Sequence, residues 1–69
     1  MNQQDFMKLV VQECQIRSQM TYVFSKRKLK RFHKWFNRIG QKHCKWSKEK
    51  ANNEFTAFMK AFKIKIDEK

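Results

Sequence analysis

Apolar residues recur at helical spacing along most of this chain. In the first segment, near Gln3 to Tyr22, they fall on two faces of a helix drawn at about 100° per residue. One face holds Phe6, Met7, Val10, Val11 and Cys14, and the other holds Leu9, Ile16, Met20 and Val23. A helix that is apolar on two sides needs two neighbours. The segment is therefore expected to be either the central helix of a monomer or part of a homodimer interface.

A second amphipathic helix is expected from about Lys26 to Ile39, with Ser25 as its N-cap. Its apolar residues share one arc of the helix, and they are Leu29, Phe32, Trp35, Phe36 and Ile39. Gly40 follows directly, and glycine suits the left-handed position that ends many helices. The segment from Gln41 to Trp46 is then expected to be a basic connection.

A third helix is expected from about Lys48 to Ile64, capped by Ser47. Its apolar face consists of Ala51, Phe55, Phe58, Met59 and Phe62. From Phe62 onward, apolar and polar residues alternate with period two, which is a strand signal. The expected fold class is a single all-α, three-helix domain over residues 1–69. The alternative adds a short two-stranded element from residues 20–24 and 62–67.

Composition supports a helical domain with a small core. The 69 residues include seven Phe and two Trp, but no Pro and one Gly. Aromatic content of 14% argues against a disordered basic tail, and the lack of turn residues argues against a sheet-rich fold. A core of this size is marginal alone, so a dimer is predicted.

Charge is concentrated in the middle of the chain. The formal net charge is +11, and residues 26–50 supply +10 of it, from eleven Lys or Arg against Glu49 alone. Such a concentration repels itself, and a polyanionic partner relieves that repulsion. Because Lys and Arg neutralise phosphates and release condensed counterions, nucleic acid, either DNA or RNA, is the leading candidate partner.

The predicted nucleic-acid-binding residues lie on the polar arc of the second helix and in the connection after it. They are Lys26, Arg27, Lys30, Arg31, Lys34, Arg38, Lys42, Lys45 and Trp46. Trp46 has two interpretations of equal weight: it stacks on an unpaired base, or it packs as a hydrophobic staple before the Ser47 cap. Trp35 and Tyr22 could also stack on unpaired bases, but Trp35 shares the face of Phe32 and Ile39, which favours a place in the core.

Catalytic, cofactor-binding and metal-binding sites are not expected. The carboxylates show no paired pattern, and a single Gly cannot make a phosphate-binding loop. Cys14, His33, His43 and Cys44 lack the spacing of a zinc finger. Two cysteines are too few for a disulfide framework, so both are interpreted as reduced.

Two other function classes compete with nucleic-acid binding. The chain could be a modulator or inhibitor, of the kind found in phages, that docks on an acidic or nucleic-acid-binding surface of a larger enzyme. It could also adsorb to a membrane surface, although the other apolar helices give the second helix a partner to bury against. With no signal peptide and no spanning segment, an intracellular location is expected, either cytoplasmic or nucleoid-associated.

Overall fold

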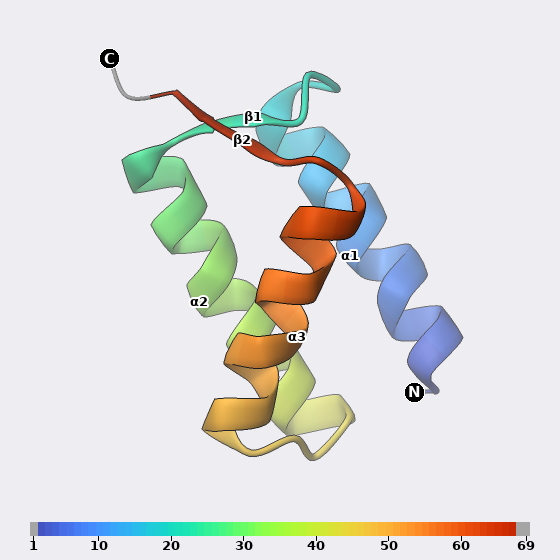
Figure 1. The fold of residues 1–69 in the computed structure, drawn as a ribbon. Helices are drawn as coiled ribbons and strands as arrows, with labels where there is room; N and C mark the ends of the chain where they lie inside the picture. Colours follow the sequence, from blue (N-terminus) through green and yellow to red (C-terminus); the bar gives the residue numbers. More distant parts are fainter. Residues whose placement is uncertain (1, 68–69) are drawn as a thin grey trace.

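Three helices and a two-stranded parallel sheet make up the computed structural model, which describes residues 2–67. The helices are α1 (Gln3–Ser18), α2 (Lys26–His43) and α3 (Lys48–Ala61). The strands are β1 (Val23–Ser25) and β2 (Lys65–Asp67). The expected three-helix domain is confirmed, and so is the alternative with a short strand pair. The sheet lies across one end of the helices, and the α2–α3 connection lies at the other end (Figure 1).

Three side-chain caps begin the three helices. Asn2 accepts a hydrogen bond from the Asp5 amide at 2.8 Å. Ser25 accepts one from the Lys28 amide at 3.2 Å, and Ser47 accepts one from the Lys50 amide at 3.1 Å. Each cap satisfies a backbone donor that has no partner within its helix. The two serine caps expected from the sequence are therefore confirmed.

The first helix ends at Ser18, four residues before the expected end at Tyr22. Ser18 is buried, and its hydroxyl donates to the Cys14 carbonyl at 2.7 Å while accepting from the Tyr22 amide at 3.1 Å. Gln19 then adopts a left-handed conformation with φ of 53°. The Ser18 hydroxyl thus offers the backbone an alternative to a further helical turn. This frees the following residues to form β1.

The second helix is longer than expected, and Gly40 does not end it. Helix α2 continues to His43, with Gly40 in its interior at ordinary helical geometry. The left-handed residue of the connection is Lys45, with φ of 56°. Gly40 is instead required by packing, because a Cβ there would lie 2.6 Å from Cε3 of Trp46. The expected C-cap role of Gly40 is therefore wrong.

The third helix ends at Ala61 rather than Ile64, because the chain there turns toward β2. Lys63 takes a left-handed conformation, and the Ile64 amide donates to the Met59 carbonyl at 2.9 Å. Strand β2 then pairs parallel with β1, with Val23 opposite Lys65. The strands are shorter than the expected ranges 20–24 and 62–67, but they arise from the same two segments.

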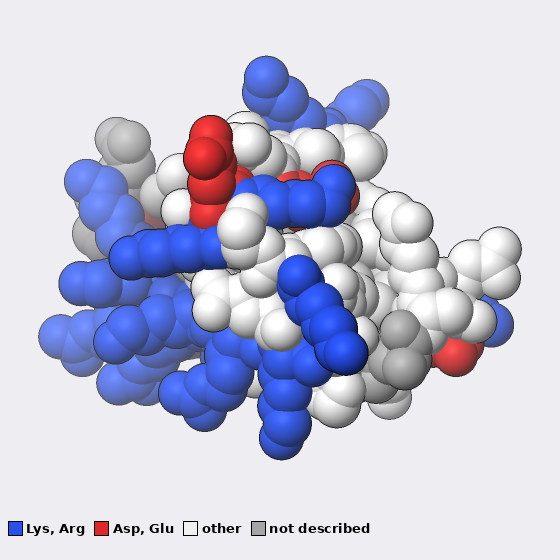
Figure 2. Space-filling model, turned by 90° about the horizontal axis from the view of Figure 1, so that it is seen from below, with Lys and Arg blue, Asp and Glu red and all other residues white. Residues whose placement is uncertain are grey.

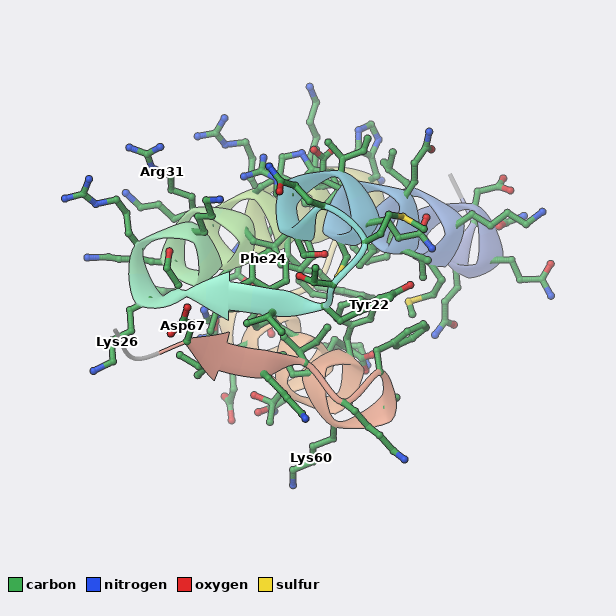
Figure 3. All side chains as sticks on the ribbon, turned by 90° about the horizontal axis from the view of Figure 1, so that it is seen from above. Tyr22, Phe24, Lys26, Arg31, Lys60 and Asp67 are labelled. Carbon is green, nitrogen blue, oxygen red and sulfur yellow. The ribbon has the colours of Figure 1, made fainter. Side chains whose placement is uncertain are left out.

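Phenylalanine rings from all three helices and from β1 form the core. Phe32 is the central ring: it stacks on Phe24 at 5.3 Å between centroids and contacts Phe55 edge-on at 5.5 Å. Phe36 contacts Phe6 at 5.3 Å and Phe55 at 5.1 Å, both edge-on. Figure 3 shows Phe24 between β1 and the neighbouring helices, on the side of β1 that faces away from β2 in that view. The fully buried positions lie on the expected faces of the helices.

The two apolar faces of α1 have different surroundings. Phe6, Val10 and Cys14 are fully buried in the core. On the other face, Ile16 is 64% exposed, and beyond the helix end Met20 is 66% exposed. The single chain therefore covers one apolar face of α1 and leaves the other at the surface.

Candidate nucleic-acid interface

The predicted cations lie on the outward surface of α2 and in the connection that follows it. This basic face consists of Lys26, Arg27, Lys30, Arg31, Lys34, Arg38, Lys42 and Lys45, and all eight are exposed. Figure 2 shows most Lys and Arg side chains along the left and lower edges of that view, with others at the top and in the centre. Figure 3 shows Arg31 extending from α2 on one side, while Lys60 extends from α3 on the opposite side.

No acidic residue belongs to α2, and Asp67 of β2 lies beside its Lys26 end, opposite Ser25 in the sheet (Figure 3). The sequence has no Asp or Glu between Glu13 and Glu49. Glu13 pairs with Arg17 at 3.3 Å, and Glu54 pairs with Lys50 at 3.6 Å, and neither cation belongs to the basic face. The formal charge carried by α2 itself is therefore positive along its length, which is a condition for attracting a polyanion.

A hollow of about 260 Å³ lies at the edge of the basic face, where α1 meets α2. Its lining consists of Arg17, Arg31, Lys34, Trp35 and Arg38. Arg31, Lys34 and Arg38 are predicted binding residues, Trp35 was weighed as a stacking residue but placed in the core, and Arg17 was not predicted. Arg17 sits in a charge-balanced segment, so only the packing of α1 against α2 reveals its place in the hollow. Trp35 was expected in the core; it does pack against the core, but it is only half-buried and also lines this hollow.

Trp46 is a packing residue at the opposite end of the core from the sheet. Its ring contacts Phe6 edge-on at 5.0 Å and lies 6.0 Å from Phe36. It also closes over Gly40. The exposed part of Trp46 lines a hollow of about 350 Å³ that includes Lys45, Lys50 and Glu54. Trp46 therefore packs in the core, while the staple before the Ser47 cap and base stacking by Trp46 both stay predictions.

His33 and Cys14 pack inside the molecule, whereas His43 is exposed and lines the hollow beside Trp46 together with Cys44. His33 stacks on Phe55 at 4.3 Å, and its Nε2 lies 2.9 Å from Oδ1 of Asn52. Cys14 is fully buried, and burial raises the pKa of its thiol to about 11. Across residues 2–67, no three His, Cys, Asp or Glu side chains are grouped so as to hold a metal ion. Over the same residues, no helix has both the length and the apolar character of a membrane-spanning segment.

Comparison with known proteins adds no family to this picture: no protein-family model, curated protein or solved structure matches the chain. The basic face and the hollow beside it are therefore the features from which a function can be proposed.

Proposed function

We propose that this protein binds nucleic acid by neutralising phosphates with the basic face of α2 and the segment from Gln41 to Lys50. The observation that carries the proposal is the exposed row of cations on α2, uninterrupted by any acid from Lys26 to Lys48. A helix of this kind fits the major groove of B-form DNA and can also follow phosphates along RNA.

Salt dependence tests the proposal directly. Neutralising even five phosphates implies a slope of about −4.5 in log K against log salt on duplex DNA, or about −3.5 on single strands. Fluorescence anisotropy on short DNA and RNA oligonucleotides across a salt series measures this slope. Absence of binding to every oligonucleotide at low salt would overturn the proposal.

A second candidate function is docking on an acidic protein surface. A groove between α2 and α3, about 390 Å³ in volume, has Leu29, Phe55, Met59 and Ile66 among its apolar lining residues, with Lys26 and Lys30 at the same site. An apolar floor beside lysines suits an acidic amphipathic segment of a partner protein. A partner that survives nuclease treatment and is lost in an Ile66→Asp variant would favour this function over nucleic-acid binding.

Self-association is expected alongside either function. The uncovered face of α1 exposes Ile16 and Met20, and a 69-residue chain builds only a small core. We expect a dimer in sedimentation equilibrium, weakened by an Ile16→Lys/Met20→Lys double variant. A monomer mass at high protein concentration would contradict this expectation.

A further inference from the structure

The hollow between α1 and α2 combines an aromatic ring with four cations. Trp35 forms one wall, and Arg17 faces it from α1, with its guanidinium carbon 5.8 Å from the ring centroid. Arg31 and Arg38 stand four and three residues from Trp35 along α2, so they lie on the turns on either side of it. Lys34 directly precedes Trp35 and also lines the hollow. The hollow therefore places a π-surface directly beside phosphate-binding groups.

Trp35 is held rigidly from the inside. Its ring stacks on Phe32 at 5.9 Å with an interplanar angle of 17°. Phe32 in turn stacks on Phe24 at 5.3 Å, with the two rings nearly parallel at 3°. Both phenylalanines are fully buried. A ring supported in this way loses little side-chain entropy when a ligand stacks on its outer surface.

Arg17 covers the exposed side of Trp35 and is itself adjustable. Its guanidinium pairs with Glu13 at 3.3 Å on the surface of α1, and both side chains are partly exposed, at 30% and 26%. A partly exposed pair of this kind contributes little to stability. Arg17 can therefore swing outward, and its planar guanidinium can stack on whatever covers Trp35.

We propose that this hollow binds an unpaired nucleotide, which makes single-stranded nucleic acid the target class. The base stacks on Trp35 beneath Arg17, and the flanking phosphates contact Arg31, Lys34 and Arg38. This inference rests on the proposed function and narrows it. In a duplex, each base face is already covered by its neighbours, so only an unpaired base can offer its face to Trp35.

The hollow beside Trp46 is a weaker site for the same ligand. Trp46 packs against Phe6 and over Gly40, and its hollow includes the carboxylate of Glu54, which repels phosphates. The hollow beside Trp35 is lined by four cations and no carboxylate, and the nearby Glu13 is already paired with Arg17. We therefore assign base stacking to Trp35 rather than to Trp46.

Base-containing and abasic oligodeoxynucleotides of equal length separate stacking from phosphate contacts. Both carry the same phosphates, and only the first carries bases. One stacked base is worth about 1–3 kcal/mol, so anisotropy should show the base-containing strand binding between about 5-fold and about 150-fold more tightly. A Trp35→Leu variant should lose this difference while binding the abasic strand as the wild type does.

Tryptophan fluorescence supplies a second readout. The base-containing strand should quench wild-type emission, and this quenching should disappear in Trp35→Leu, where only Trp46 remains. Because Trp35 also packs against the core, a Trp35→Phe variant, which keeps a ring there, is expected to retain part of the discrimination. Far-UV circular dichroism confirms that both variants are folded.

The outcomes distinguish this inference from the proposed function. If the wild type binds both strands with equal affinity, stacking in this hollow is wrong while phosphate neutralisation stands. If Trp35→Leu keeps the full discrimination, the base stacks elsewhere and the inference is also wrong. If neither strand binds at low salt, the proposed function fails together with it.

Discussion

Helices α2 and α3 both bury phenylalanine side chains in the core, but they expose different charged side chains to solvent. Helix α2 buries Phe32 and Phe36, and α3 buries Phe55 and Phe58. Outside, α3 mixes signs: Glu49 lies in its first turn, and Lys50 pairs with Glu54 at 3.6 Å. The outward surface of α2 carries cations and no acid at all.

This difference shows that folding does not require the charge pattern of α2. Helix α3 packs on the same rings with a mixed surface, in which an i,i+4 pair of opposite charges is favourable. Helix α2 instead repeats like charges at i,i+4, as from Lys26 to Lys30 and from Lys30 to Lys34, which destabilises a helix by a few tenths of a kcal/mol per pair. A pattern that opposes folding in this way is what the polyanionic partner proposed above would call for.

The largest expected effect concerns the inner surface of α2. Phe32→Ala removes a fully buried ring that contacts Phe24 and Phe55, and it should lower the free energy of unfolding by about 3–5 kcal/mol. Urea denaturation followed by circular dichroism measures the loss. Phe62→Ala is the matched control beyond the end of α3, since Phe62 is 37% exposed and should cost much less. Equal losses at the two positions would contradict the burial described above.

Substitutions on the outer surface of α2 should weaken nucleic-acid binding and leave the stability of the protein nearly unchanged. Arg31→Ala/Lys34→Ala should lower the magnitude of the salt slope by roughly two units while leaving the free energy of unfolding nearly unchanged. Lys60→Ala/Lys65→Ala removes the same charge from exposed positions of α3 and β2. That control should leave the slope nearly unchanged. Equal reductions in both double variants would mean that net charge alone, and not the basic face, drives binding.

The buried Cys14 thiol should make the free energy of unfolding depend on pH in the alkaline range. The buried Cys14 thiol has a pKa of about 11, against 9.0 for an unperturbed thiol, because burial disfavours the thiolate. Between these values the unfolded chain loses the Cys14 proton and the folded chain keeps it, so stability falls as pH rises. The loss should reach about 2 kcal/mol by pH 11.

A Cys14→Ala variant isolates this effect. Discharging the lysines acts on both proteins alike, whereas only the wild type has the buried thiol. Urea denaturation from pH 8 to 11 should therefore show the wild-type free energy of unfolding falling relative to that of Cys14→Ala. Parallel pH profiles would show that the Cys14 thiol is not shielded from water.

The positions of the helices and of two N-caps could be predicted from the sequence because they depend on nearby residues. The end of α1 and the place of Arg17 could not, because they depend on tertiary contacts. Helical spacing located the three helices, and the hydroxyls of Ser25 and Ser47 marked two helix starts. The early end of α1 depends on both hydrogen bonds of the buried Ser18 hydroxyl, which no pattern in the sequence signals. Arg17 joins Trp35 only because α1 packs beside α2. The basic face needed no tertiary information, because all but one of its cations belong to one helix.

Gly40 gives the smallest expected effect and the sharpest test of how α2 meets the connection to α3. Alanine there raises helix propensity by about 1 kcal/mol, but its Cβ would lie 2.6 Å from Cε3 of Trp46. Trp46 cannot retreat inward, because Phe6 and Phe36 already pack against its ring. Overpacking of this kind costs about 1–3 kcal/mol, so Gly40→Ala should be destabilising by about 1 kcal/mol overall in urea denaturation. In a Trp46→Leu background the clash is relieved, and Gly40→Ala should become stabilising.

The two backgrounds together distinguish close packing from a helix cap. If Gly40 instead ended the helix in a left-handed conformation, alanine would destabilise the protein in both backgrounds. A change from destabilising to stabilising between the two backgrounds therefore indicates close packing against Trp46.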